Sequence, residues 1–346
     1  MKIRAFITHK KAEYFSDCQD RFGVNSGTKS IAVSDGMGST WQQKIWAQIL
    51  VEEFIKNIDY KPTHENIKSL CSLWRNSVEA SIAHLKETNA PQNIIIRNER
   101  CLVDGRSAGA TFVGIRFDGN DWNGSVLGDS CLIEWDGENA KFFTSQDVEA
   151  FDSYPDYFDS DATKDGKGSP KPIDGTLTTG CVLLVSDPFS EFLLEHKTQG
   201  DIAEYINQIL KLSSHEEFES LVNEWRNAGM HNDDTTLVIV ENDEKAEFSI
   251  SHLDILDKLK EEESRQIREL EETPTILADT TEEKPTFPKE HFSQSEDERD
   301  FIDELKRSLD TYLKKLDIGN KKVSRIKQFF GGLICGIIQR YKISKK

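Results

Sequence analysis

The chain has 346 residues and a formal net charge of −18, with 37% apolar and 30% charged residues. This length predicts one large domain with an appendage. The acidic balance excludes general affinity for nucleic acid phosphates, which needs a basic surface. The six cysteines include no CxxC pair, so neither a disulfide framework nor a zinc site is indicated. Because no long apolar stretch follows the first residues, we expect a cytoplasmic protein.

Short apolar runs rich in β-branched residues predict strands across residues 1–243. In chain order they are Ile3–Thr8, Ser30–Ser34, Ala110–Phe117, Gly124–Leu127, Cys131–Trp135, Cys181–Ser186 and Thr235–Glu241. Residues 145–176 are polar and are expected to form a mobile loop rather than core.

The spacing of apolar residues predicts helices over Ser39–Ile58, Thr63–Thr88 and Gly200–Asn227. The first opens on a Ser/Thr pair and the second on Thr63, residue types that cap helices. Because helices and strands do not alternate strictly, the chain is not expected to form a parallel sheet. An α+β fold, with helices covering antiparallel sheets, is favoured.

The composition changes after residue 243. A charged helix is expected at Leu253–Glu272, followed by a Thr-, Pro- and Glu-rich linker and then two helices. We therefore divide the chain into a domain at 1–243, a charged helix and flexible linker at 244–292, and an amphipathic helical hairpin at 293–346.

The last helix carries a wide apolar stripe with basic flanks, and its unbroken apolar run, Phe329–Ile338, is too short to span a bilayer. Three uses stay open for it. The helix packs on the protein's own body or the preceding helix, binds a partner protein, or lies on an anionic membrane surface.

Three aspartates stand at the edges of predicted strands: Asp35, Asp187 and Asp233. A carboxylate at the edge of a buried strand is unfavourable unless a cation meets it. Three that converge are most simply explained by divalent metal, and hard oxygen ligands favour Mg²⁺ or Mn²⁺. The eight histidines are dispersed and are expected to be structural or solvated. None is interleaved at ligand spacing, which disfavours zinc.

The ordered set of motifs resembles the type-2C metal-dependent Ser/Thr protein phosphatases, bacterial branch. The motifs are SDGMG at 34–38, SAGATF at 107–112, LGDS at 127–130, VLLVSD at 182–187 and NDDTTLVIV at 232–240. The resemblance covers roughly residues 1–243. It implies an αββα sandwich, two stacked antiparallel sheets flanked by helices, here with a C-terminal helical appendage.

The resemblance also implies a two-metal centre of Mn²⁺ or Mg²⁺. Asp35 would bridge both ions, and the Gly36 carbonyl would bind the second. Asp187 and Asp233 would hold the first, and Asp129 would line the cleft and could help a weaker third. A water between the ions would lose its proton and attack the phosphorus in line.

Several residues depart from the family pattern. Asp20 is included in the metal set, but its neighbour Gln19 stands where an acidic residue is common, and Phe15 stands where a phosphate-gripping Arg is expected. Pro188 replaces a usual Gly after Asp187. Met37 follows the Asp-Gly pair, so no histidine is present there to protonate the leaving serine or threonine oxygen. Three arginines could bind phosphate in place of the expected one: Arg4, Arg21 and Arg106. Their spacing does not favour any of the three.

Two functions follow from this set of residues. The first is a Ser/Thr phosphatase that acts in signal transduction on a phosphoprotein and opposes a cognate Ser/Thr kinase, with Asp35, Asp187 and Asp233 as its catalytic residues. The second is a catalytically weak or dead phosphatase-like scaffold that binds a phosphoprotein or kinase, as the departures allow.

Overall fold

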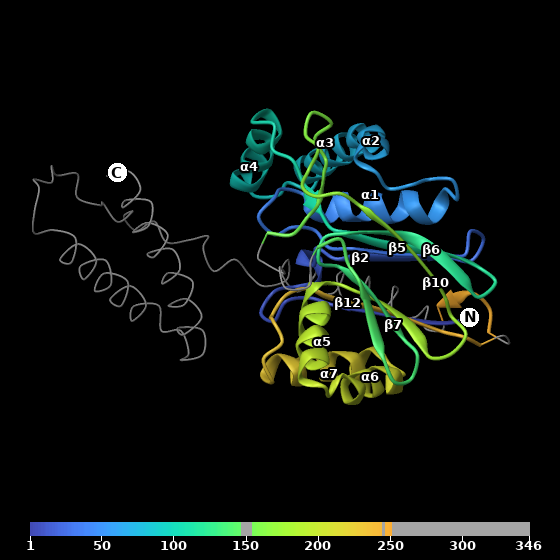
Figure 1. Cartoon of the computed structure of the whole chain (residues 1–346). Coiled ribbons are helices and arrows are strands. Elements are labelled where there is room, and N and C mark those ends of the chain that lie inside the picture. The colour runs from blue at the N-terminus through green and yellow to red at the C-terminus, as the bar shows by residue number, and fades with distance from the viewer. Residues whose placement is uncertain (147–153, 244–245, 251–346) are drawn as a thin grey trace, which may run out of the picture. The chain divides into compact units, whose positions relative to one another are not determined.

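Two large sheets stack face to face in the computed structural model, and helices cover the outer face of each (Figure 1). The structure describes residues 1–146, 154–243 and 246–250. This αββα arrangement confirms the predicted fold class. The expected charged helix, linker and C-terminal hairpin lie outside the described residues, apart from residues 246–250.

The larger sheet has six strands in the order β13-β1-β12-β11-β7-β8. Their bounds are β13 (Ser249–Ile250), β1 (Lys2–Thr8), β12 (Thr235–Glu241), β11 (Cys181–Val185), β7 (Cys131–Trp135) and β8 (Ala140–Phe143). All pairs are antiparallel except β13 with β1, which is parallel, so one edge departs from the expected antiparallel sheet.

The second sheet has five antiparallel strands in the order β10-β6-β5-β3-β2. They are β10 (Lys171–Thr176), β6 (Asp121–Leu127), β5 (Phe112–Asp118), β3 (Ser30–Ser34) and β2 (Arg21–Asn25). A short pair, β4 (Gly109–Ala110) with β9 (Phe158–Asp159), lies beside the site described below.

Helices α1 (Gln43–Lys56), α2 (His64–Ile67), α3 (Cys71–Glu87) and α4 (Gln92–Val103) lie on the side of the five-stranded sheet. Helices α5 (Asp187–Gln199), α6 (Ile202–Lys211) and α7 (His215–Asn227) cover the six-stranded sheet (Figure 1). The described residues also contain two 3-10 helices, at Phe15–Asp17 and Lys68–Leu70. Within the described residues no helix is both long enough and apolar enough to cross a bilayer.

Buried side chains fill the three spaces between the four layers. On β11, Leu183 packs in the cluster beneath α5 to α7, while Val182 and Leu184 pack between the two sheets. A third cluster, with Trp46 and Phe54, joins α1 and α3 to the smaller sheet. Because a central strand is buried on both faces, its sequence is a continuous apolar run, and each buried aliphatic side chain contributes about 1.5–3 kcal/mol.

The helix starts differ in part from the predicted caps. Thr63 does cap α2, since its hydroxyl accepts from the Asn66 N–H at 3.2 Å. The Ser/Thr pair before α1 does not cap it, because the Thr40 hydroxyl donates to the Met37 carbonyl at 2.8 Å. α1 begins only at Gln43, after Gln42 in the left-handed region at φ 56°.

The prediction of a mobile loop at 145–176 is wrong for its second part. Phe158 is fully buried in the cluster beneath α1, and β10 pairs along its length with β6. Because β10 is an edge strand, it tolerates Pro172 and exposes most of its side chains. Its composition therefore resembles that of a loop.

Two helical predictions also need correction. The region Gly200–Asn227 forms two helices, because Ser214 caps a new one by accepting from the Glu217 N–H. Two helices, α4 and α5, were not predicted. In α5 the Asp-Pro pair ends a strand but also begins a helix, because proline is well tolerated in the first helical turn.

Candidate metal centre

Backbone hydrogen bonds hold the SDGMG turn against the SAGATF segment. The Thr111 N–H donates to the Asp35 carbonyl at 2.8 Å, and the Met37 N–H donates to the Gly109 carbonyl at 3.0 Å. Gly36 forms a β-bridge with Ala110. A Cβ on Gly36 would lie 3.0 Å from the Gln43 backbone, so the close approach of α1 favours glycine here.

The LGDS motif presents Asp129 after a turn that favours glycine. Gly128 has φ +97°, and a Cβ there would meet the Asp156 carbonyl oxygen at 2.6 Å. The Ser130 and Thr111 hydroxyls lie 2.6 Å apart and form a buried hydrogen bond. This hydrogen bond connects the LGDS motif to the SAGATF segment, which holds the Asp35 turn in place.

The end of β11 and the start of α5 position Asp187. The Ser190 hydroxyl lies 2.8 Å from the Asp129 carbonyl and 3.0 Å from the Asp187 carbonyl, and so links α5 to the LGDS motif. The Ser186 hydroxyl accepts from the Thr236 N–H at 2.9 Å. Pro188 stands in the first helical turn, where an N–H has no intrahelical partner, so its missing donor costs the helix nothing.

The two adjacent aspartates before β12 have different environments. Asp234 is 2% exposed and accepts from the Lys10 and Gln19 backbone N–H groups at 2.9 and 2.7 Å. Asp233 is half-buried and pairs with the Lys10 ammonium at 2.7 Å. The Arg226 guanidinium donates to the Asp233 carbonyl at 2.6 Å. Asp234 is therefore structural, and Asp233 is the aspartate that reaches the site.

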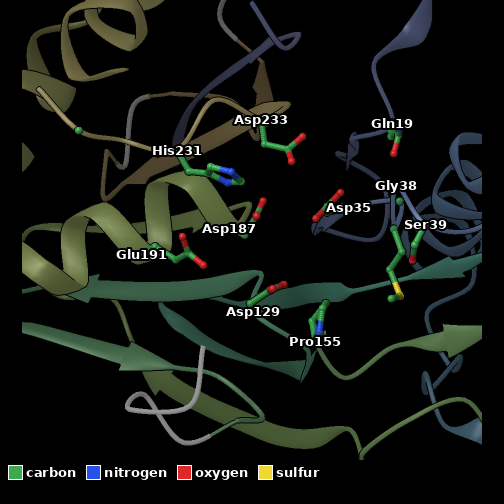
Figure 2. A pocket seen from close by; sticks show the side chains of 13 residues that line it. Gln19, Asp35, Gly38, Ser39, Asp129, Pro155, Asp187, Glu191, His231 and Asp233 are labelled. Carbon is green, nitrogen blue, oxygen red and sulfur yellow. The ribbon is translucent and has the colours of Figure 1, made fainter. Parts of the chain in front are cut away.

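These segments surround a cavity of about 530 Å³. It is lined by Gln19, Asp35, Gly36, Met37, Gly38, Ser39, Asp129, Pro155, Asp187, Glu191, Gly229, His231 and Asp233. Figure 2 shows the carboxylates of Asp35, Asp129, Asp187 and Asp233 gathered around one space. Five of the six residues predicted to bind metal thus meet, although they come from four separate segments.

Asp20, the sixth, lies beneath the cavity rather than in its lining. It is fully buried, and one of its carboxylate oxygens accepts from the Thr236 hydroxyl at 2.7 Å. Its carboxyl also lies within hydrogen-bonding reach of Asp35. The structure therefore places Asp20 behind Asp35, where it can support that side chain, and not on the cavity wall.

Burial and mutual repulsion raise the pKa values of these carboxyls. Burial first, then the charges of Asp129 and Asp233, raises the pKa of Asp35 from 3.8 to about 8. Burial raises the pKa of Asp129 to about 7, and burial with the neighbouring carboxylates raises that of Asp187 well above 3.8. No Lys or Arg occurs among the described residues that line the cavity. A bound cation would relieve this cost.

The donor set fits a divalent ion. One ligand atom each from Asp187, His231 and Asp233 lie within 4.8 Å of one another. One oxygen of Asp129, a residue that is only 4% exposed, is buried with no hydrogen-bond partner in the described structure. Buried carboxylate oxygens are normally paired or bound to metal.

Two residues of this site were missed in the sequence. Glu191 lies four residues after Asp187, on the same face of α5, and lines the cavity. His231 was expected to be structural or solvated, but it lies beside Asp187 and Asp233. Their sequence distances from the motif aspartates, four residues and two residues, are the only signal that could have identified them.

The residues considered for phosphate binding do not reach the cavity. Phe15 packs against the core beneath α5 to α7. Arg4 binds the Leu210 carbonyl and Glu241, and Arg21 binds the Cys18 carbonyl. Arg106 is exposed and does not line the cavity. Gln19 does line it, in the place of the expected acidic residue.

Residues 15–164 match a family model described as Protein phosphatase 2C. The matched segment contains three of the five motifs, SDGMG, SAGATF and LGDS. The match confirms the resemblance to the type-2C protein phosphatases that the motifs indicate. No curated protein matches the sequence of the chain.

Solved structures of bacterial phosphatases are similar to the chain at low identity. Serine/threonine phosphatase Stp1 from Staphylococcus aureus is 12% identical with a TM-score of 0.46, covering 70% of this chain and 95% of that one. The catalytic domain of PstP in complex with two manganese ions is 17% identical with a TM-score of 0.40, covering 69% and 96%. PppA, a regulatory component of T6SS in Pseudomonas aeruginosa, is 16% identical with a TM-score of 0.43, covering 70% and 98%.

Proposed function

We propose that the chain is a metal-dependent phosphatase that hydrolyses phosphoserine or phosphothreonine in a protein. The observation that carries the proposal is the convergence of Asp35, Asp129, Asp187 and Asp233 on one cavity without a lysine or arginine in its described lining. The match of residues 15–164 to the phosphatase family supports the same reaction.

Two Mn²⁺ or Mg²⁺ ions bound here would neutralise phosphate charge and lower the pKa of water at the site. Asp35 would contact both ions, and the Gly36 carbonyl is the proposed ligand of the second. Asp187 and Asp233 would hold the first, and Asp129 with Glu191 would serve a weaker third. Asp20 would act from behind, through Asp35.

The chain's own residues can do three things for the reaction. Backbone hydrogen bonds from residues 109–111 fix the Asp35 turn. The hydroxyls of Ser186 and Ser190 fix the start of α5. Arg226 fixes the loop that carries Asp233. A fixed set of ligands places a phosphoryl group in line with its nucleophile without reorganisation.

The alternative is a phosphatase-like scaffold that binds a phosphoprotein or kinase without turnover. Two observations favour it: Gln19 stands at the cavity as a neutral amide, and none of the described lining residues is an arginine. Pro188 no longer supports it, because the first turn of α5 accommodates proline. Weaker binding of the second ion and of substrate follows from the remaining departures.

Hydrolysis of p-nitrophenyl phosphate with Mn²⁺, in the presence and absence of chelator, separates the two functions. We expect turnover by the wild type that chelator abolishes. Asp35→Asn and Asp187→Asn should each lower kcat by at least about 100-fold, because each removes a charged ligand that the transition state needs. Asp118→Asn, at the exposed end of β5, is the matched control and should retain wild-type activity.

Equal inertness of wild type and variants across Mn²⁺ and Mg²⁺ would exclude the enzyme and leave the scaffold. If the wild type is active, the proposed substrate, a phosphoprotein, and its cognate Ser/Thr kinase can be sought together. Asp35→Asn keeps the shape of the cavity while removing turnover. A pull-down with this variant should therefore retain a Ser/Thr phosphoprotein that the wild type releases.

A further inference from the structure

His231 is held at the mouth of the cavity by the residues on either side of it. Met230 is 4% exposed, and its N–H donates to the Trp225 carbonyl at 2.9 Å. Asn232 accepts from the Lys11 N–H at 2.9 Å, and Arg226 fixes the Asp233 carbonyl. The backbone that carries His231 is thus anchored before and after the imidazole.

The imidazole of His231 lies among carboxylates. A ring nitrogen lies within 4.8 Å of one oxygen each of Asp187 and Asp233, and Figure 2 shows the ring directed toward the space that these carboxylates share. Glu191 interacts electrostatically with the ring from α5. Among the described residues, no side chain forms a hydrogen bond with this ring within the cavity. Its nitrogen is therefore available to a ligand.

We propose that His231 supplies a nitrogen ligand to the ion held by Asp187 and Asp233. This inference rests on the proposed metal site, and it adds a ligand of a different chemical kind. The oxygen of Asp129 without a hydrogen-bond partner in the described structure, on a residue 4% exposed in the same lining, independently supports cation binding in this cavity.

A nitrogen ligand changes which ion the site prefers. Mg²⁺ favours oxygen ligands and keeps its waters, whereas first-row transition ions also accept imidazole, with Mn²⁺ the weakest binder of that series. A site with two carboxylates and one imidazole therefore binds a transition ion such as Mn²⁺ more tightly than Mg²⁺. His231 contributes to this preference because its nitrogen raises the affinity for the transition ion more than the affinity for Mg²⁺.

Pulsed electron paramagnetic resonance of Mn²⁺ bound to the full chain detects such a ligand directly. We expect the ¹⁴N modulation of a coordinated imidazole in the wild type and its loss in His231→Gln. By calorimetry the same variant should bind Mn²⁺ about tenfold more weakly, while its affinity for Mg²⁺ changes less than about threefold. His231 is exposed, so the substitution leaves the fold intact.

His84→Gln is the matched control, because His84 is exposed on α3 and does not line the cavity. It should keep both the ¹⁴N signal and the Mn²⁺ affinity. Bound Mn²⁺ without an imidazole signal, or the same signal in His231→Gln, would overturn this inference and leave the proposed phosphatase intact. No Mn²⁺ binding at all would overturn both.

Discussion

Single residues set the geometry of the carboxylates in this site. Asp129 follows Gly128, whose φ of +97° lies in the left-handed region that favours glycine. The space beside Gly128 is also closed, since a Cβ there would meet the Asp156 carbonyl oxygen at 2.6 Å and Thr111 at 2.8 Å. The direction of the Asp129 side chain therefore depends on having glycine, which lacks a side chain, at the preceding position.

Gly128→Ala should lower the free energy of unfolding by about 3 kcal/mol, because it adds backbone strain and a steric overlap. Gly119→Ala is the control: Gly119 also has positive φ, at +62°, but nothing lies within 4 Å of its Cβ position. We expect it to cost about 1 kcal/mol. Urea unfolding measures both. Equal losses would show that the space beside Gly128 is not tight.

At the scale of elements, polar side chains connect segments that the sequence keeps far apart. Thr111 joins the Asp35 turn to Ser130, and Ser190 joins α5 to the Asp129 carbonyl. Arg226, on α7, donates to carbonyls of His9 and Asp233 and to the Thr235 hydroxyl. The helices thus position the carboxylates through hydrogen bonds, in addition to covering the sheet.

Arg226→Met should weaken Mn²⁺ binding about tenfold, because it frees the loop that carries Asp233 and leaves carbonyls without donors. We expect the free energy of unfolding to fall by about 2 kcal/mol. Arg75→Met is the control, since Arg75 forms only an exposed pair with Glu79 on α3. It should change either quantity by less than about 0.5 kcal/mol. Unchanged Mn²⁺ affinity in Arg226→Met would contradict the positioning role.

At the scale of the whole molecule, the carboxylates gathered around the cavity have a consequence for stability. The pKa of Asp35 is raised from 3.8 to about 8 in the folded, metal-free chain. Below about pH 4 Asp35 is protonated in both states, and its full stabilising contribution is present. Between about pH 4 and 8 only the unfolded chain ionises it. The folded state therefore loses stability as the pH rises through this window.

The chelator-treated protein should accordingly melt at lower temperature at pH 8 than at pH 6. We expect a fall in Tm of about 5 °C, equivalent to roughly 2 kcal/mol for a domain of this size. Saturating Mn²⁺ should remove the fall, because the ion stabilises the ionised carboxylates. Asp35→Asn should reduce it without metal. A metal-free Tm that rises from pH 6 to pH 8 would contradict the raised pKa of Asp35.

The parts of the fold that the sequence predicts best are buried on both faces. Strands β3, β7 and β12 have the predicted bounds, because only continuous apolar runs fit between a sheet and a helix layer. The edge strand β10 was missed, because solvent on its outer face permits polar residues. The domain limit at 243 stays a prediction, and β13 at Ser249–Ile250 still pairs with β1.

For the site, the motif aspartates could be located because each ends an apolar strand. The expected convergence of Asp35, Asp187 and Asp233 is visible in the structure, while their roles stay proposals. His231 was not predicted, since a lone histidine in a polar loop carries no periodic signal and only its place two residues before Asp233 links it to the site. Its place depends on the long-range contacts of α7 and residues 9–11 with that loop.

Calorimetric titration of the chelator-treated chain with Mn²⁺ tests most directly whether these carboxylates form a metal centre. We predict binding of more than one ion per chain, and loss of the tighter event in Asp187→Asn. Wild-type protein that binds no Mn²⁺ at millimolar concentration, while remaining folded, would contradict the account.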